Sequence, residues 1–350
     1  MVLRLILIFS CISIYAGVSG YQIHHFIFYP TLLYYLFFGN TKMSELTYFL
    51  PLPVFLIFTF LSGKSLDLGA LEMYVFFVSY IYLTGKLHEI ELQKLKSAHL
   101  QITILLVLTI LIHFLGFDIN EYISFQNPNS DLAERTLRNF RYVGVFGSPF
   151  EAGVICFILL WFGKNKINII LLILVFISGI LTLSKAFLLG IPFLLFRYDL
   201  IRFKLRNIII FSTVFSIIFF FGIYFLEYWS GITRLVDLLT LNSTNNSVID
   251  LLFAGRYGSE ESTVSSRLTL FNFIVPNGFV RSDYPLDSLI IYCQHTFGIY
   301  GIPLLISIYY SFYKFNKKLC LYLVLASLGA PIIFKNYIAQ ALAIHTKLNK

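Results

Sequence analysis

Residues 138–153 read RNFRYVGVFGSPFEAG, and the apolar run VICFILLWFG follows without a break. Arg135, Arg138 and Arg141 lie three residues apart just before this run. A helix of about 20 apolar residues is long enough to cross the hydrocarbon core of a bilayer. The stretch therefore predicts a membrane span over 143–163, with three arginines at its mouth.

The composition of the whole chain indicates an integral membrane protein. Of its 350 residues, 58% are hydrophobic and 13% are charged, and the mean hydropathy is +0.79. A soluble domain of this size has about 25% charged residues. Phe and Tyr together number 61, which fits the aromatic edges of a bilayer. The pI of about 9.1 fits basic cytoplasmic loops, so no nucleic-acid partner is predicted.

The apolar segments predict an all-α, polytopic membrane protein with about 11 transmembrane helices, in the range 10–12. The segment 186–196 is short and contains Pro192, so it could be a re-entrant span. Residues 336–346 could add a short twelfth helix. The first segment resembles a signal peptide, but its retention preserves the alternation of charges. The expected spans are 2–19, 22–39, 46–63, 68–85, 99–117, 143–163, 167–184, 186–196, 207–228, 286–310 and 319–335.

Basic residues mark every second connection between these spans. Lys42, Lys86, Lys164, Arg197 and Lys314 fall on one side of the membrane if the spans hold. The positive-inside rule makes that side cytoplasmic and places the N-terminus there. The other side then holds a first outer loop, 118–142, and a large periplasmic loop, 229–285, before the last helices. The chain 1–350 is expected to form a single polytopic membrane domain.

Arginine is the only basic residue of the two predicted outer loops. They contain seven arginines and no lysine, whereas the chain has 15 lysines and 11 arginines. A guanidinium group binds phosphate or carboxylate through two parallel hydrogen bonds, which favours an anionic ligand. If 135–142 is helical, Arg135, Arg138 and Arg141 share one face and could clasp a diphosphate. The alternatives are ion pairs with neighbouring Asp and Glu, or arginines that snorkel at the end of a span.

Cysteine and histidine indicate neither a disulfide framework nor a metal site. The four cysteines, Cys11, Cys156, Cys293 and Cys320, lie in apolar stretches without paired spacing. The seven histidines form no metal-binding pattern, and the adjacent His24 and His25 are expected at the membrane interface. No metal and no other cofactor is predicted.

Several segments resemble those of bacterial O-antigen and capsule polysaccharide polymerases. RYVGVFGSPFEAG is similar to the segment R-x-x-G-x-F-x-x-P-x-x-x-G that opens a central helix in that family. ISGILTLSKAFLLGI resembles the family's LTLSRTA segment, with Lys185 where arginine is usual. The resemblance covers about residues 100–310. SSRLTLFNFIVPNGF and DSLIIYCQHTFGIYGI resemble two later segments through Arg267, Gly278, Asp287, Gly298 and Gly301.

The resemblance implies a glycosyltransferase without a cofactor. Such an enzyme would polymerise undecaprenyl-diphosphate-linked oligosaccharide repeat units into O-antigen or capsular polysaccharide, at the outer face of the bacterial cytoplasmic (inner) membrane. The implied partners are the lipid bilayer, a chain-length regulator and a flippase. O-antigen ligases of the same superfamily carry a histidine eleven residues before the glycine, where this chain has Asp287 before Gly298. This difference favours a polymerase, and a ligase or a lipid-linked oligosaccharide flippase is the alternative.

Asp287 is the candidate catalytic base. It lies where the large outer loop enters the span 286–310, and an ionisable residue at a span suggests a function. It could accept the proton of the acceptor hydroxyl. Alternatively, it could cap the helix, and Asp283 competes for both roles. The residues expected to bind the diphosphate and the glycan are Arg135, Arg138, Arg141, Arg267 and Arg281.

Overall fold

A computed structural model describes residues 1–16, 21–47, 49–125, 141–198, 275–280, 288–328 and 331–346. These residues are mostly helical and contain no β-strand, which confirms the all-α class. The helices are α1 (Val2–Phe9), α2 (His25–Phe38), η2 (Met43–Leu46), α3 (Pro51–Leu61), α4 (Leu68–Gly85), α5 (Glu89–Phe114), η3 (Ile119–Glu121), α7 (Pro149–Gly163), α8 (Ile169–Leu181), α9 (Lys185–Arg197), α14 (Leu289–Phe297), η4 (Gly298–Tyr300), α15 (Gly301–Phe315), α16 (Lys317–Ser327), η5 (Ile332–Phe334) and α17 (Asn336–Thr346).

Three helical segments are long and apolar enough to cross a membrane: α4, α5 and the stretch Leu289–Phe315. Four further apolar helices, α2, α3, α7 and α8, are shorter than a full crossing. These lengths are compatible with a membrane protein. The number of spans and the orientation of the chain stay predictions, and the span predicted at 207–228 lies outside the described residues.

The prediction of one long helix over 2–19 is wrong, because α1 ends at Phe9. The carbonyl groups near its end are used by distant side chains. Tyr80 donates its hydroxyl hydrogen to the Leu7 carbonyl at 2.8 Å, and Gln340 Nε2 donates to the Ser10 carbonyl at 2.7 Å. These contacts join the end of α1 to α4 and α17, and they replace the next turn of the helix.

The segment predicted as one span over 286–310 is interrupted at Gly298. This residue has φ +55° and ψ −139°, which is a conformation that glycine adopts without steric cost. Helix α14 therefore ends at Phe297, and α15 begins at Gly301 after one 3-10 turn. The segment predicted over 319–335 likewise ends early, since α16 stops at Ser327. Residues 336–346 form a separate helix, α17, as expected for the additional short helix.

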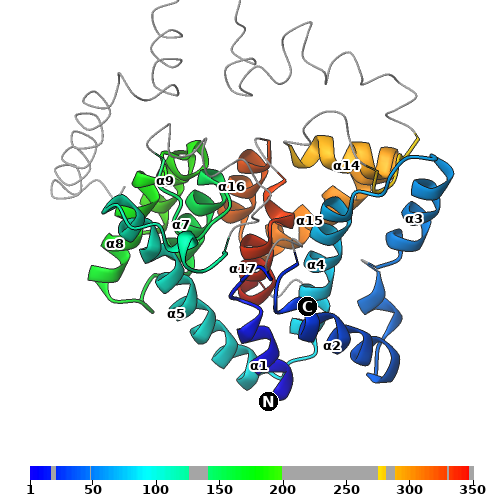
Figure 1. The fold of residues 1–350 in the computed structure, drawn as a ribbon, viewed down its shortest axis with the longest axis horizontal. Coiled ribbons are helices and arrows are strands. Elements are labelled where there is room, and N and C mark those ends of the chain that lie inside the picture. Colours follow the sequence, from blue (N-terminus) through cyan, green and yellow to red (C-terminus); the bar gives the residue numbers. More distant parts are fainter. Residues whose placement is uncertain are drawn as a thin grey trace, which may run out of the picture.

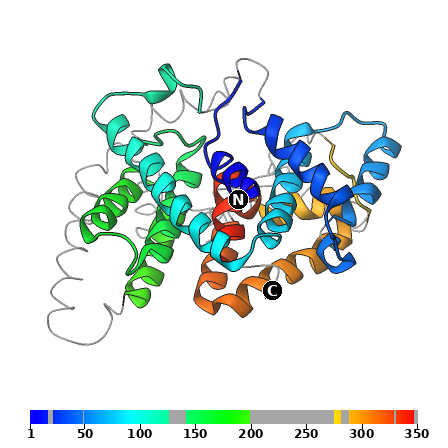
Figure 2. The same ribbon diagram turned by 90° about the horizontal axis from the view of Figure 1, so that it is seen from below.

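Helix α17 is the centre of the described fold. Every residue from Tyr337 to Thr346 is buried, and the helix packs against α4, α5 and α7. In Figures 1 and 2 it lies between α7–α9 on one side and α3, α4 and α14 on the other. The C-terminal helix thus holds together two groups of helices that are distant in the sequence.

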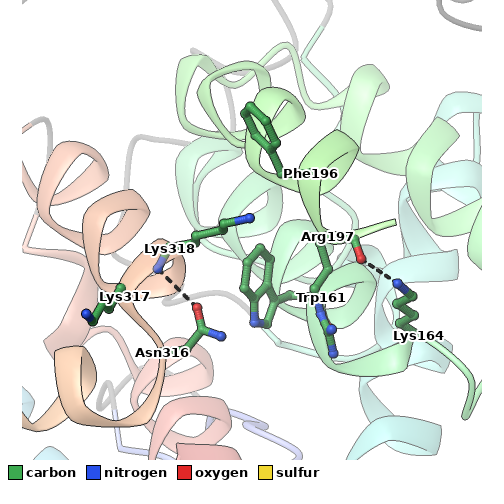
Figure 3. Close-up of a pocket in the computed structure, with 7 residues that line it drawn as sticks. All are labelled: Trp161, Lys164, Phe196, Arg197, Asn316, Lys317 and Lys318. Atoms are coloured by element: carbon green, nitrogen blue, oxygen red, sulfur yellow. Dashed lines mark hydrogen bonds between the residues drawn. The ribbon is translucent and has the colours of Figure 1, made fainter. Parts of the chain in front are cut away.

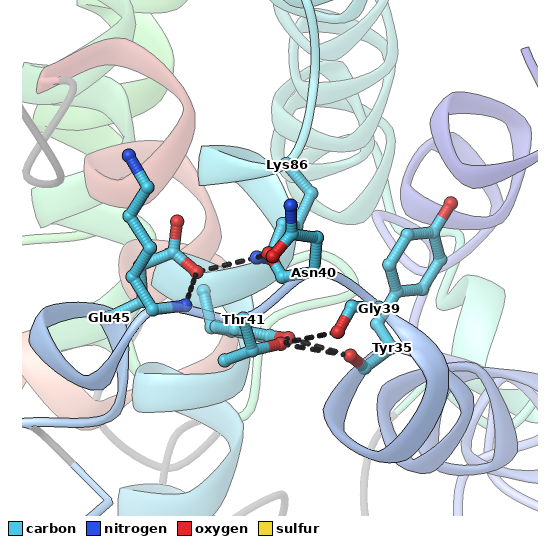
Figure 4. A network of polar contacts seen from close by, with 8 residues as sticks. Tyr35, Gly39, Asn40, Thr41, Glu45 and Lys86 are labelled. Atoms are coloured by element: carbon cyan, nitrogen blue, oxygen red, sulfur yellow. Dashed lines mark hydrogen bonds and ion pairs between the residues drawn. The ribbon is translucent and has the colours of Figure 1, made fainter.

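A polar network joins the end of α2 to the end of α4 on the side predicted to be cytoplasmic (Figure 4). Lys86 Nζ donates to the Asn40 carbonyl at 2.8 Å and pairs with the Glu45 carboxylate. Tyr82 donates its hydroxyl hydrogen to the Tyr35 carbonyl at 2.9 Å. The hydrogen bond from Lys86 holds the pKa of Glu45 below its usual range. The connection after α2 is therefore fixed to α4 rather than extended into solvent.

Candidate functional site at the start of α7

Arg141 is the one predicted site residue within the described part of the chain. Arg135, Arg138, Arg267, Arg281 and Asp287 lie outside it, as does Asp283. The shared face of the three arginines and the role of Asp287 therefore stay predictions. The site is built here from Arg141 and from the side chains around the first turn of α7.

Arg141 is half-buried just before α7. Its Nε is buried and has no hydrogen-bond partner among the described residues. Burial lowers the pKa of the guanidinium group, although arginine keeps its charge at neutral pH. The next residue, Tyr142, donates its backbone N–H to the Leu181 carbonyl at 3.3 Å. The backbone that carries Arg141 is therefore attached to the end of α8.

The end of α5 fixes the segment between Arg141 and α7. Gly144 donates its backbone N–H to His113 Nδ1 at 3.3 Å, and Val145 donates to Thr109 Oγ1 at 3.1 Å. Asn120 Nδ2 in turn donates to the Gly144 carbonyl at 2.9 Å. These hydrogen bonds with side chains satisfy backbone groups that are not part of a helix or strand, and they give the segment a defined conformation.

Helix α7 begins with a strong N-terminal signal. Ser148 is the N-cap, and its Oγ accepts the backbone N–H of Glu151 at 3.2 Å. Pro149 occupies the first helical position, where the missing N–H is not needed. Glu151 stands three residues after the cap, the position that favours Glu or Gln in a capping box. The sequence Ser-Pro-Phe-Glu thus starts the helix and places a carboxylate at its first turn.

Glu151 is only 8% exposed and lies against the start of α17. Burial disfavours the charged form of the Glu151 carboxyl group, and the ammonium group of Lys335 and the backbone amides of Gly147 and Tyr337 oppose this effect only in part. An uncompensated carboxylate would be expensive to bury, and these three groups reduce the cost of placing Glu151 inside the fold. A buried carboxyl group whose protonation is perturbed by its surroundings is a candidate for proton transfer.

Two tyrosines lie within electrostatic range of Glu151. Gln22 forms a side-chain hydrogen bond with Tyr15, and the charges of Glu151 and Glu72 act on the same hydroxyl group. The charge of Glu151 also acts on the hydroxyl group of Tyr337. We call Tyr15, Gln22, Glu72, Glu151, Lys335 and Tyr337 the Glu151 cluster.

The second carboxylate of the cluster contacts a buried histidine. Glu72 Oε1 lies 3.1 Å from His25 Nε2. His24 and His25 are 1% and 6% exposed, so their side chains face the protein interior, and their position at the membrane interface stays a prediction. The Glu72 carboxylate offsets part of the cost of burying His25. Among the described residues, no group of three or more His, Cys, Asp or Glu side chains could hold a metal ion.

Ser288 caps helix α14 immediately after Asp287. Its Oγ accepts the backbone N–H of Ile290 at 3.2 Å. The alternative role of Asp287 as the helix cap is therefore filled by its neighbour. The segment 275–280 packs beside this helix, where Gly278 donates its backbone N–H to the Thr296 carbonyl at 3.0 Å.

Most of the Glu151 cluster was not predicted from the sequence. Glu151 itself could have been predicted as a site residue, because an ionisable residue inside an apolar span indicates a function. Lys335, Tyr337 and Tyr15 come from segments far apart in the sequence, and no motif or spacing connects them to Glu151.

We compared the chain with family models, with curated proteins and with solved structures, and none of the three comparisons gives a match.

Proposed function

We propose that the protein polymerises undecaprenyl-diphosphate-linked oligosaccharide repeat units into O-antigen or capsular polysaccharide at the outer face of the bacterial cytoplasmic membrane. The observation that carries this proposal is the buried carboxylate of Glu151 at the first turn of α7. It follows the segment of Arg141, which supplies a half-buried positive charge ten residues earlier. A carboxyl group for proton transfer and an anion-binding guanidinium group on one segment of the chain suit transfer of a sugar from a lipid diphosphate.

The reaction needs a base and a stabilised leaving group. The oxygen of the acceptor sugar hydroxyl forms a new bond to the anomeric carbon of the donor glycan. The bond from that carbon to the diphosphate oxygen breaks, and undecaprenyl diphosphate leaves with the bonding electrons. The hydroxyl proton passes to a carboxylate, for which Glu151 joins Asp287 as a candidate. Arg141, with the other predicted arginines, offsets the charge on the leaving diphosphate.

Deletion of the gene in the native bacterium tests this proposal. A polymerase mutant keeps a single repeat unit on lipid A core, or a single unit on the lipid carrier in the case of a capsule. Loss of every repeat unit from the core, with finished polymer retained on the lipid carrier, would identify a ligase instead. Unpolymerised repeat units confined to the inner leaflet would identify a flippase.

The proposal also requires the outer location of the Arg141 segment. Reporter fusions at Ser130 and Ser247 lie in the two predicted outer loops. We expect periplasmic reporter activity at both positions. Cytoplasmic reporter activity at either position would overturn the orientation, and the proposed outer-face chemistry with it.

A further inference from the structure

A cavity lined by basic side chains lies at the end of α7 remote from Glu151 (Figure 3). Its volume is about 370 Å³, at the lower end of the range for small-ligand sites. Four of the lining residues are lysine or arginine, and none is acidic. The lining residues are Trp161, Lys164, Phe196, Arg197, Asn316, Lys317 and Lys318. We call them the basic pocket.

One wall of the basic pocket comes from the ends of α7 and α9. Lys164 Nζ donates to the Arg197 carbonyl at 2.5 Å. The guanidinium carbon of Arg197 lies 5.6 Å from the centre of the Trp161 ring, within the range of a cation–π contact. Tyr198 donates its hydroxyl hydrogen to the Leu160 carbonyl at 2.7 Å. These contacts hold the two positive charges of this wall in place.

The opposite wall is the first turn of α16. Asn316 is the N-cap, and its Oδ1 accepts the backbone N–H of Lys318 at 3.1 Å. Lys317 and Lys318 are exposed in the first turn, where the helix dipole disfavours positive charge. Figure 3 shows Trp161 standing between this wall and Arg197. The arrangement concentrates positive charge from three helices around one cavity.

Three positive charges of the basic pocket, those of Arg197, Lys317 and Lys318, lack a carboxylate partner in the described part of the chain. None of the ion pairs found there involves Arg197, Lys317 or Lys318. Like charges on opposite walls repel one another, and an anion in the cavity would attract both walls and offset that repulsion. Phosphate is an anion that both guanidinium and ammonium groups bind through charge-assisted hydrogen bonds.

We propose that the basic pocket binds the phosphate group of an anionic ligand. The ligand is either the headgroup of an anionic phospholipid in the cytoplasmic leaflet or a soluble phosphate ester. Exposed aromatic side chains beside the pocket, including Phe196 (51% exposed) and Tyr313 (47% exposed), fit a position at the membrane interface. Basic pockets between transmembrane helices on the cytoplasmic side bind such headgroups. This site is separate from the proposed polymerase reaction.

Trp161 provides a direct readout of binding. The chain has two tryptophans, Trp161 and Trp229, so Trp229→Phe leaves Trp161 as the only one. The full-length Trp229→Phe protein in neutral detergent is titrated with dihexanoylphosphatidylglycerol, dihexanoylphosphatidylcholine and glycerol 3-phosphate. We expect saturable fluorescence changes with the anionic lipid at concentrations where the zwitterionic lipid has no effect. An equal response to glycerol 3-phosphate would support the same site with a soluble ligand.

Removal of the lysine charges tests whether the basic pocket itself binds the anionic lipid. We expect the double variant Lys317→Gln and Lys318→Gln to bind phosphatidylglycerol about thirtyfold more weakly, since each basic residue near a headgroup contributes about fivefold. Lys314→Gln is the matched control, because Lys314 is an exposed lysine on α15 that does not line the pocket. Elution on size exclusion verifies the fold of each variant.

Three results would overturn the proposal. The first is the absence of a Trp161 response to the anionic lipid and to glycerol 3-phosphate. The second is unchanged affinity in the double variant. The third is an equal loss of affinity in Lys314→Gln, which would indicate binding by general surface charge.

Discussion

Replacement of Glu151 separates its role in chemistry from its role in the start of α7. The carboxylate faces Lys335 and the backbone amides of Gly147 and Tyr337. Glu151→Gln keeps the size of the side chain and an amide oxygen that accepts a hydrogen bond. Gln also serves as well as Glu at this position of a capping box. It cannot take up a proton at neutral pH, whereas Glu151→Ala removes the acceptor altogether.

The expected magnitudes differ enough to distinguish the two roles. In Glu151→Ala, two buried backbone amides lose their acceptor, at about 1–3 kcal/mol each. A loss of about 2–6 kcal/mol is a large part of the stability of an ordinary domain, so we expect lower abundance in the membrane. Glu151→Gln retains one acceptor and should accumulate at nearly the normal level. If Glu151 is the base, polymerisation by Glu151→Gln falls roughly 10²–10⁴-fold.

The assay compares polymer length with protein abundance in a deletion strain that carries each variant. Glu151→Gln is expected to accumulate in the membrane but to leave single repeat units. Glu121→Gln is the matched control, because Glu121 is exposed in the predicted first outer loop, and this variant should polymerise normally. Normal long chains in Glu151→Gln would refute the catalytic role and leave Glu151 as a structural residue of α7.

Three other predictions follow from single positions. Arg141→Lys keeps the charge but loses the planar fork, so polymer length should fall nearly as far as in Arg141→Ala at equal protein abundance, and full activity in the lysine variant would show that charge alone matters. Asp287→Asn should leave abundance normal, because Ser288 caps α14, and should abolish polymerisation if Asp287 acts as the base; long chains in this variant would remove it from the mechanism. Gly278→Ala should destabilise the protein by about 2–4 kcal/mol, because its φ is +76° and the new methyl group would lie 2.5 Å from a backbone carbonyl. Gly63→Ala, at φ +65° with open space around it, should cost only about 1 kcal/mol, and equal melting temperatures in detergent for the two variants would contradict the steric argument.

Helices bounded by local signals were predicted closely. The segment 68–85 corresponds to α4, Leu68–Gly85. Asp67 precedes it as the N-cap, and its side chain accepts the backbone N–H of Ala70 at 3.0 Å. An apolar run with a cap residue at its start contains enough information to define both ends of such a helix.

Helix ends that depend on distant contacts were not predictable in this way. The end of α1 is set by Tyr80 and Gln340, which are far away in the sequence. The central helix α17 is buried on all sides, so it has no polar face that would give a helical period. Its burial is a property of the whole assembly of helices rather than of residues 336–346.

The candidate site likewise combines features that a short stretch of sequence predicts with features that depend on distant contacts. Arg141 and the start of α7 were recognised because they lie in one short stretch of sequence. The partners of Glu151 were missed because Lys335 and Tyr337 reach it only through the position of α17. The remaining predicted arginines and Asp287 lie outside the described residues, so their relation to Glu151 depends on the functional tests.

The length of α7 relates the two proposed sites to the membrane. Its 15 residues span about 22 Å at 1.5 Å per residue. A bilayer has a hydrocarbon core about 30 Å thick, so a crossing α7 requires local thinning, or protein rather than lipid around its ends. Either arrangement brings Arg141 at one end and Lys164 at the other to the depth of lipid phosphate groups, which their long side chains can reach. The short length of the buried helix α7 is therefore a physical reason why phosphate-binding groups would occur at both of its ends, as the two proposals require: a lipid diphosphate on the predicted outer side and a phosphate ligand in the basic pocket on the predicted inner side.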